Sequence, residues 1–389
     1  MKLCALLLAS ASAFGQNLTP AAWLEDLDFL ARELPAHHKN LFYTLKKEDF
    51  TARVAKISAG LPQMTEPEIR AALVRLVASV GNAHTSINVL AGTPMYPLQF
   101  AEFPEGYYVM AAANQEAIGA RLISIGGVPA VEIRKRLVPM VPMETPLMEK
   151  NRLPGLLRSA VALGMESAAF RFEKDGRQFE VALEALPPRQ QPKLETAQFP
   201  VPLYLSDRAS AYWFRYLERE RALYIQYNRC QDVPSHPFAD FTKEVMAAAG
   251  QHPVEKIIVD LRHNGGGNSE VIRPLYRALK AGPRRQIFVL TSQETFSSGF
   301  LAEWEFKHQF KAQIVGEASS QRPNAYGDIR SLELPNSKLK VWYCTKYFKM
   351  ASHGDPDSLP VDIPVETTAK DYFAGRDPVL ERVLERGGR

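Results

Sequence analysis

The first part of the chain carries apolar side chains at helical spacing. The segment "PAAWLEDLDFLARELP" repeats them every three or four residues, and Thr19 precedes it as a predicted N-cap. The segment "TEPEIRAALVRLVASVG" repeats the pattern and opens with Thr65, followed three residues later by Glu68, which is the arrangement of a capping box. Residues 16–90 are therefore predicted to form a helical region, and "HTSINVL" is predicted to be the first strand.

Between residues 91 and 190 the pattern changes to strand-like alternation. The segment "LISIGGVPAVEIRKRL" predicts a strand, a turn, a short strand and a helix. The segment "AAFRFEKDGRQFEVAL" predicts a hairpin that turns at Lys174-Asp175-Gly176. The following "ALPPRQQPKLETAQFPVP" contains five prolines and no periodicity, which predicts a linker or surface loop. This part is expected to be rich in β-structure.

From about residue 205 onward, short apolar runs alternate with amphipathic stretches. The predicted strands are "ALYIQYN", "KIIVDLR", "QIFVLTS", "AQIVGEA" and "KVWYCTKYF". The predicted helices between the first four strands are "PFADFTKEVMAAAG", "EVIRPLYRALKAG" and "GFLAEWEFKHQF". This order predicts an α/β fold whose largely parallel, doubly wound sheet lies in residues 191–389, with functional sites at the carboxyl ends of its strands.

Length and composition indicate a soluble globular chain of two or three domains, with 389 residues, 46% of them hydrophobic and 23% charged. The net charge of +4 is spread along the chain without a Lys/Arg-rich tract, which excludes nucleic acid as a partner. There is no HExxH motif and no cysteine–histidine ligand spacing, so neither a metal nor an organic cofactor is expected. After the N-terminal segment, no stretch approaches the roughly 20 apolar residues of a membrane span.

The N-terminal segment is typical of a secretory signal peptide. Met1-Lys2 is followed by the apolar run "LCALLLASASAF", which ends in the small residues Ala11-Ser12-Ala13. We expect residues 1–15 to be removed and the mature protein to be exported, to a periplasm or to the outside of the cell. Cys230 and Cys344 then remain, either as one disulfide or as two buried thiols, and the sequence leaves both open.

Three segments at predicted strand ends carry candidate chemistry. "VDLRHNGGGN" runs from a strand into three glycines, whose backbone N–H groups can hold an anion or a developing oxyanion, but it lacks the Lys-Ser/Thr of a nucleotide-binding P-loop. "TFSSGF" places Ser297 and Ser298 at a strand-to-helix turn, where a serine is either an N-cap or an exposed nucleophile. "VGNAHTSI" holds His84 between a helix and a strand, and histidine is suited to activate a serine.

Together these segments resemble a known family. "DLRHNGGGN", "TFSSGFLAE", "VGEASSQRPNAYGD" and "PVDIPVE" occur in the order and spacing of the tail-specific (C-terminal processing) proteases, peptidase family S41. "VGNAHTSI" resembles that family's G-D-x-H-T segment, and "GARLISIGGVPAVEI" resembles its PDZ-type middle region, so the resemblance covers nearly the whole mature chain. It implies a ClpP/crotonase-like catalytic sheet in residues 191–389 and a PDZ-like region in residues 91–190.

The resemblance also implies roles for the two serines and the glycine turn. Ser297 matches the family's nucleophile, and the backbone N–H of Ser298 matches one donor of the oxyanion hole. Gly266 matches the second donor, and Gly265 and Gly267 are its neighbouring alternatives.

The base and the orienting acid follow from the branch of the family. The Ser-Lys branch places a lysine base after the "VGE" strand, but here that position is Arg322, whose guanidinium stays protonated and cannot act as a general base. The chain instead resembles the tricorn-like Ser-His branch, with His84 as the base. The acid that orients the histidine precedes the segment "VDI", which makes Asp355 the predicted acid and Asp357 the alternative. Arg322 and Tyr326 are predicted to bind the substrate's carboxylate, unless Arg322 forms a salt bridge within its loop.

Two positions depart from the family pattern. Asn82 replaces a common aspartate two residues before the histidine, and Phe300 stands where the Ser-Lys branch carries a glutamate. The sequence predicts an exported serine-type peptidase that hydrolyses peptide or protein substrates through an acyl-enzyme. The alternative is a non-catalytic protein on the same fold that binds a peptide or a lipophilic ligand, because a fold does not fix a function. The oligomeric state is left open.

Overall fold

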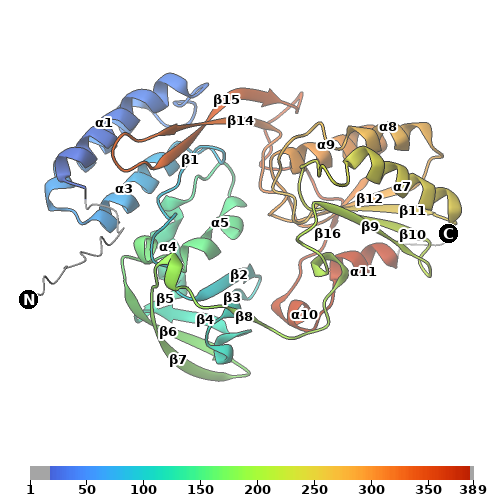
Figure 1. The fold of residues 1–389 in the computed structure, drawn as a ribbon, viewed down its shortest axis with the longest axis horizontal. Helices are drawn as coiled ribbons and strands as arrows, with labels where there is room; N and C mark the ends of the chain where they lie inside the picture. Colours follow the sequence, from blue (N-terminus) through green and yellow to red (C-terminus); the bar gives the residue numbers. More distant parts are fainter. Residues whose placement is uncertain (1–17, 386–389) are drawn as a thin grey trace, which may run out of the picture.

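The computed structural model describes residues 18–385 as a mixed α/β protein with three sheets (Figure 1). The predicted signal peptide, residues 1–15, lies outside the described residues. Within residues 18–385, no helix has both the length and the apolar character that crossing a membrane requires.

Three helices open the described chain, as the apolar spacing predicts. Thr19 is the N-cap of the first helix and accepts a hydrogen bond from the N–H of Ala22 at 3.2 Å. The predicted capping box is also present, with the N–H of Thr65 donating to the Glu68 carboxylate at 2.7 Å. These helices are α1 (Pro20–His37), α2 (Lys47–Gly60) and α3 (Glu66–Ala78), with a 3-10 turn at Leu61–Gln63.

A hairpin from late in the chain packs against these helices. Its strands, β14 (Asn324–Glu333) and β15 (Lys340–Lys349), form a small sheet with β1 (Ser86–Ile87) in the order β1-β15-β14. Leu334, Leu339 and Val341 share one apolar core with α1, α2 and α3, and Figure 1 shows the hairpin beside α1. The hairpin thereby brings the segment after Arg322 next to the loop that carries His84.

The middle of the chain forms a second, largely antiparallel sheet in the order β2-β3-β4-β6-β7. The predicted hairpin is confirmed: β6 and β7 pair as far as Lys174 and Arg177, and Asp175 and Gly176 have φ values of 50° and 76°. The strands are β2 (Leu98–Phe103), β3 (Gly106–Ala112), β4 (Arg121–Ile125), β5 (Val128–Pro129), β6 (Ser167–Lys174), β7 (Arg177–Glu184) and β8 (Glu195–Thr196).

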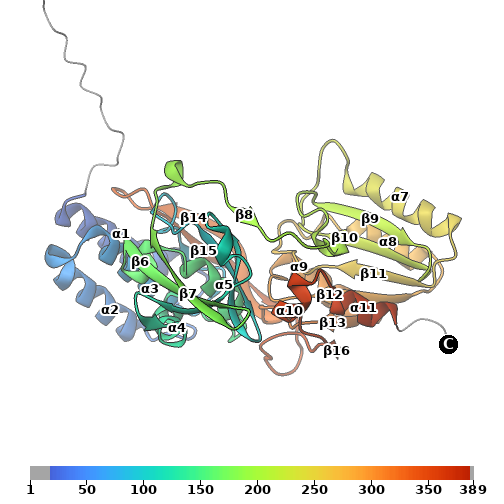
Figure 2. The same cartoon turned by 90° about the horizontal axis from the view of Figure 1, so that it is seen from below.

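Short helices connect these strands, and the proline-rich segment leads away from them. The segment that carries β8 runs from the middle sheet toward the final one (Figure 2). The helices are α4 (Ala130–Leu137), α5 (Met148–Leu156) and α6 (Ala160–Leu163), with 3-10 turns at Gln115–Ala117, Val138–Met140, Pro188–Gln190 and Leu203–Leu205.

The final part of the chain forms a six-stranded sheet in the order β16-β13-β12-β11-β10-β9. The predicted alternation is confirmed, because β10, β11, β12 and β13 are parallel and α7, α8 and α9 connect them. The strands are β9 (Tyr212–Leu217), β10 (Ala222–Tyr227), β11 (Lys256–Asp260), β12 (Gln286–Thr291), β13 (Gln313–Gly316) and β16 (Ile363–Pro364). The helices are α7 (Phe238–Gln251), α8 (Arg273–Ala281), α9 (Ser298–Phe310), α10 (Ala369–Phe373) and α11 (Pro378–Leu384).

The strand order of this sheet does not confirm a doubly wound arrangement. Neighbouring strands follow one another along the chain, so the order does not reverse within the sheet. Right-handed crossovers that all advance in one direction place their helices on one face. Accordingly, α7, α8 and α9 share one apolar core, whereas α11 packs on the other face. The adjacent carboxyl ends of β11 and β12 lead into the glycine turn and into the turn of Ser297.

Candidate active site

Ser297 occupies a strained turn between β12 and α9. Its φ and ψ are 54° and −125°, a region that residues with side chains seldom adopt. It stands at the N-cap position of α9, yet its side chain makes no capping hydrogen bond. Ser297 is partly exposed, whereas Phe296 and Ser298 on either side are buried, and its N–H donates to Oε1 of Gln321 at 2.5 Å. The structure therefore presents the hydroxyl of Ser297 without using it as a cap.

The glycine turn after β11 packs directly against Ser297. A Cβ on Gly266, whose φ is 110°, would lie 2.7 Å from Cβ of Ser297 and 3.0 Å from the backbone N of Ser298. A Cβ on Gly299 would likewise lie 2.2 Å from the carbonyl oxygen of Asn264. No side chain fits at either position, so the glycines allow the two turns to approach each other.

The side chain of Asn264 holds the glycine turn in place through hydrogen bonds to the backbone. Its buried Nδ2 donates to the carbonyl of Tyr227 at 2.8 Å, and its Oδ1 accepts from the N–H of Gly266 at 3.0 Å. Cys230 also donates to this Oδ1, at 3.3 Å, and is a free thiol. A rigid turn of this kind fixes the direction of any N–H groups that remain free.

The hydrogen bond from Gly266 corrects one predicted oxyanion donor. Because the N–H of Gly266 is engaged by Asn264, it does not point freely into the site. Within residues 18–385, the N–H groups of Ser298, Gly265 and Gly267 have no acceptor. The Ser298 side chain is itself engaged, donating to the carbonyl of Gly267 at 2.6 Å. The candidate oxyanion donors are thus the backbone N–H groups of Ser298, Gly265 and Gly267.

His84 lies beside the segment that carries Ser297. Its ring stacks on the ring of Phe296, the residue before Ser297, with centroids 4.4 Å apart. Nδ1 of His84 is buried and has no hydrogen-bond partner within the described chain, and no hydrogen bond joins the ring to Ser297. Hydrogen bonds of this kind are often absent from a site without substrate and form in the reacting complex.

Burial lowers the pKa of His84 to about 4, the positive charge of Arg152 acts in the same direction, and the backbone carbonyl of Tyr326 opposes this shift in part. The imidazole is therefore neutral at pH 7, which a proton acceptor requires. The same surroundings disfavour the imidazolium that forms when His84 accepts a proton. A negative charge is needed nearby to offset this cost.

The predicted contact between Asp355 and His84 is not present. Asp355 and the alternative Asp357 both pair with Arg322, at 3.3 Å and 2.6 Å, and their side chains are about half exposed. The guanidinium, which carries the nearest strong positive charge, attracts both carboxylates away from the imidazole. Arg322 is accordingly committed to this salt bridge and does not offer a free cation to a substrate.

Tyr326, the other predicted substrate-binding residue, is also engaged. Its hydroxyl accepts a hydrogen bond from Nδ2 of Asn40 at 3.0 Å. Its ring packs at 4.7 Å from that of Tyr43 and at 4.8 Å from that of Tyr347. The contacts with Asn40 and Tyr43 join β14 to the segment between α1 and α2, beside the loop of His84.

The segment between residues 142 and 152 connects the two halves of the site, which the sequence pattern did not indicate. The carboxylate of Glu144 accepts from the N–H of Ala83 at 3.0 Å, next to His84. Farther along, Lys150 pairs with Glu317, and Asn151 donates to the carbonyl of Gln293 at 2.7 Å. A glutamate in a stretch that also contains prolines and methionines gives no periodic or motif signal.

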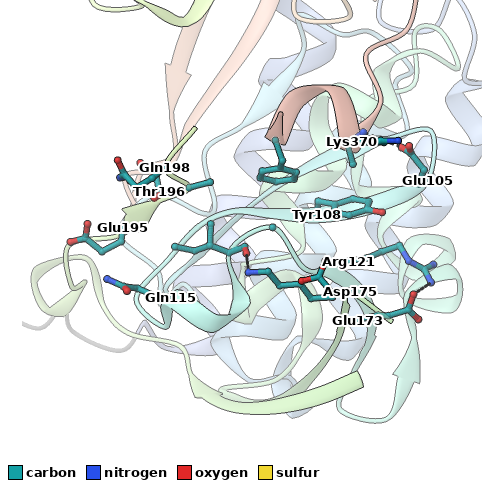
Figure 3. A pocket seen from close by; sticks show the side chains of 16 residues that line it. Glu105, Tyr108, Gln115, Arg121, Glu173, Asp175, Glu195, Thr196, Gln198 and Lys370 are labelled. Atoms are coloured by element: carbon teal, nitrogen blue, oxygen red, sulfur yellow. Dashed lines mark hydrogen bonds and ion pairs between the residues drawn. The ribbon is translucent and has the colours of Figure 1, made fainter. Parts of the chain in front are cut away.

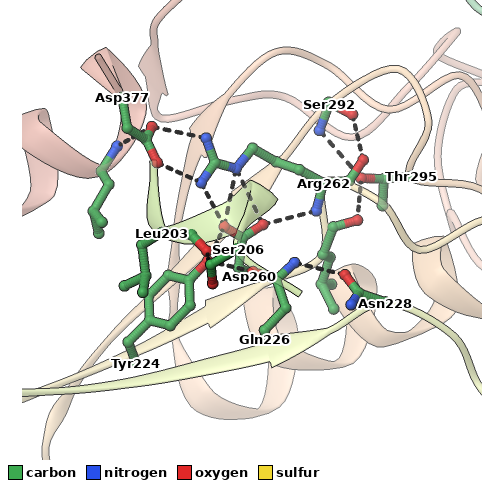
Figure 4. Close-up of polar contacts among 12 residues, drawn as sticks. Leu203, Ser206, Tyr224, Gln226, Asn228, Asp260, Arg262, Ser292, Thr295 and Asp377 are labelled. Carbon is green, nitrogen blue, oxygen red and sulfur yellow. Dashed lines mark hydrogen bonds and ion pairs between the residues drawn. The ribbon is translucent and has the colours of Figure 1, made fainter. Parts of the chain in front are cut away.

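An ion cluster beneath the glycine turn joins β11 to α11 (Figure 4). Arg262 lies between Asp260 and Asp377, and both nitrogens of its fork are 2.8 Å from the oxygens of Asp377. Burial alone would raise the pKa of Asp260, but the adjacent Arg262 holds it below its usual value. Tyr224 donates to Asp260 at 2.6 Å, and the ring of Tyr204 lies 3.9 Å from the guanidinium carbon.

Another buried carboxyl, that of Glu303, lies on α9, the helix that begins one residue after Ser297. Glu303 is fully buried, and neither of its oxygens has a hydrogen-bond partner within residues 18–385. Burial raises the pKa of Glu303 to about 8, and the nearby hydroxyl of Ser319 opposes this shift only in part. The side chain is therefore largely protonated at pH 7.

We predict that Glu303 makes the protein less stable as pH rises. The folded state holds a proton that the unfolded chain releases above its ordinary pKa of about 4.5, so the free energy of unfolding falls between about pH 4.5 and pH 8. Each pKa unit corresponds to about 1.4 kcal/mol. In urea unfolding at several pH values, Glu303→Gln is expected to remove this slope. Glu305→Gln, on the same helix with a partly exposed side chain, is expected to keep it. Equal slopes in both variants would contradict the prediction.

A cavity of about 720 Å³ lies away from these residues (Figure 3). It is lined by the middle sheet, the segment of β8 and α10, and neither Ser297 nor His84 contributes to it. Charged side chains such as Glu105, Arg121 and Lys370 surround it. Such a lining does not suit a lipophilic ligand, which prefers a mostly apolar wall.

Comparison with known proteins gives a fold but no family match. No protein-family model matches the chain, and no curated protein matches it. Mature CPAF complexed with lactacystin has a TM-score of 0.67 at 12% identity, covering 94% of this chain and 97% of that chain. A mutant of CPAF has a TM-score of 0.68 at 12% identity, with 95% and 99% covered. The tricorn protease has a TM-score of 0.47 at 15% identity, over 94% of this chain and 36% of that chain. The fold is thus similar to that of CPAF.

Proposed function

We propose that the protein is a serine-type peptidase that cleaves peptide bonds through an acyl-enzyme. The observation that carries this proposal is the conformation of Ser297, a partly exposed serine with a φ of 54° that does not cap the helix it precedes. Strain of this kind at a strand-to-helix turn is characteristic of an exposed nucleophile. A serine that only capped α9 would need neither the strain nor the free hydroxyl.

In the proposed reaction, Oγ of Ser297 attacks the carbonyl carbon of the substrate while Nε2 of His84 takes the hydroxyl proton. The electron pair of the C=O bond moves to oxygen, and the free N–H groups of Ser298 and Gly267 hold the oxyanion. The C–N bond then breaks, and His84 returns its proton to the leaving amine. A water molecule then attacks the ester in the same way, with His84 again taking and returning a proton. This step releases the acid product and restores the hydroxyl of Ser297.

The likeness to the fold of family S41 proteases supports a peptidase, and the residues present favour its tricorn-like Ser-His branch. Arg322, at the position of the lysine base, is held by two carboxylates and remains protonated. The apolar N-terminal sequence supports export, so the proposed substrates are peptides or proteins outside the cytoplasm.

A fluorophosphonate probe tests the proposal because it reacts covalently with activated serines. We expect the folded protein to be labelled with time, and the adduct to map by mass spectrometry to the peptide that contains Ser297. Heat-unfolded protein should not be labelled, since the activation depends on the folded site. Peptide binding without labelling or cleavage would instead support the non-catalytic binding protein.

A further inference from the structure

The proposed reaction lacks a carboxylate to balance the charge on His84. When the imidazole takes the proton of Ser297, a cation forms in partly buried surroundings, near the positive charge of Arg152. Nδ1 of His84, where an orienting acid acts in a serine triad, is buried and without a partner within residues 18–385. Asp355 and Asp357 are held by Arg322.

Glu144 is a buried carboxylate at the loop of His84. One oxygen, Oε2, accepts from the N–H of Ala83 at 3.0 Å and from Nδ2 of Asn82 at 2.9 Å. The other oxygen, Oε1, is buried and has no partner in the described part of the chain. Since Ala83 immediately precedes His84, the carboxylate is anchored one residue from the imidazole, and the backbone and charge of Arg322 also face it.

The surroundings of Glu144 hold the loop firmly. Asn82, whose side chain donates to Glu144, accepts in turn from the thiol of Cys344 at 2.9 Å and from the hydroxyl of Thr85 at 2.8 Å. The same segment continues into α5, where Asn151 contacts Gln293 ahead of Ser297. The segment of Glu144 therefore contacts both the loop of His84 and the loop that leads to Ser297.

We infer that Glu144 is the positioning residue for His84: its free oxygen orients the imidazole through Nδ1 and offsets the positive charge that forms during attack. This inference rests on the proposed function, and it assigns to Glu144 the role that the sequence assigned to Asp355. Glu144 exchanges no proton with the substrate. The proton moves from Ser297 to Nε2 of His84 and then to the leaving amine, and Glu144 stays ionised throughout.

The charge state of Glu144 makes the role testable by pH. Burial raises the pKa of Glu144 to about 7, the N–H of Ala83 and the backbone and charge of Arg322 oppose this shift, and the charge of Asp355 adds to it. Tyr43 and Cys344 also face the carboxylate, and burial raises the pKa of both. Activity should therefore increase as Glu144 ionises through about pH 7.

The experiment compares the rate of fluorophosphonate labelling at Ser297 in Glu144→Gln and in the unaltered protein, from pH 5 to pH 9. The glutamine keeps an oxygen for Ala83 and Asn82, so the fold should survive, which thermal unfolding checks. At pH 8 we expect labelling to slow by roughly 10²–10⁴-fold, because an amide cannot balance the imidazolium. The rise through about pH 7 should vanish, and Glu144→Asp should restore part of the rate.

Glu149→Gln is the matched control, because its carboxylate pairs with Arg134. It is expected to label at the unaltered rate with the unaltered pH profile. Labelling that survives Glu144→Gln but is lost in Asp355→Asn would overturn the inference while leaving the peptidase standing. If Glu144→Gln does not fold, the pH profile of Glu144→Asp decides, and an unaltered profile there overturns the inference. Failure of the unaltered protein to label at Ser297 would overturn the proposed function itself.

Discussion

Ser297→Ala is expected to remain folded and to lose turnover on the order of 10⁴–10⁶-fold, because removal of the nucleophile leaves only substrate binding and the oxyanion donors. The change in stability separates this role from that of a helix cap. Loss of a capping serine costs about 0.5–2 kcal/mol. Ser297 makes no capping bond, so the free energy of unfolding should change by less than about 0.5 kcal/mol. Hydrolysis of a quenched peptide library and urea unfolding measure the two quantities.

Ser298→Ala is the control for this prediction. The proposed reaction uses only the backbone N–H of Ser298, which the substitution keeps. Its hydroxyl donates to the carbonyl of Gly267 at 2.6 Å, so the variant should lose about 1 kcal/mol of stability and keep most of its turnover. An inactive Ser298→Ala beside an active Ser297→Ala would move the nucleophile by one residue. Two active variants would favour the binding protein.

The parts of the fold that the sequence predicted are those with local causes. The capping box at Thr65, the hairpin at Asp175-Gly176 and the alternation of strands and helices after residue 205 each follow from neighbouring residues. The position of Ser297 follows from the same local order, because a helix begins one residue after it. The sequence did not predict that β14 and β15 pack against the N-terminal helices, since that contact joins distant segments.

The parts of the site that the sequence missed depend on competition between distant groups. The resemblance to the family implied Asp355 as the acid, but Arg322, from another segment, pairs with its carboxylate. The resemblance also implied Gly266 as a donor, but the side chain of Asn264 accepts its hydrogen bond. Glu144, the proposed positioning residue, had no pattern to mark it, because its contact with the loop of His84 joins segments 61 residues apart. Each outcome depends on which partner lies within contact of a charged or polar group in the folded chain. The spacing of residues along the sequence does not specify that partner.

Arg262→Leu is expected to destabilise the protein by about 3–5 kcal/mol, the usual loss when one partner of a buried ion cluster is removed. Arg262, Asp260 and Asp377 are only 5%, 0% and 7% exposed, so the substitution leaves two buried carboxylates without a cation. The carboxylates can escape this cost by taking up protons. The loss should therefore be smaller at pH 4 than at pH 8, as urea unfolding at both values would show.

The control for this prediction is an exposed ion pair. Lys243 and Asp240 lie 2.7 Å apart, with side chains 78% and 54% exposed, and Lys243→Ala should change the free energy of unfolding by less than about 0.5 kcal/mol. Arg262 also lies two residues before Asn264, whose side chain fixes the glycine turn beside Ser297. In the fraction of Arg262→Leu that stays folded, fluorophosphonate labelling should therefore slow as well. Unaltered stability with unaltered labelling would show that the cluster neither holds α11 in place nor supports the turn.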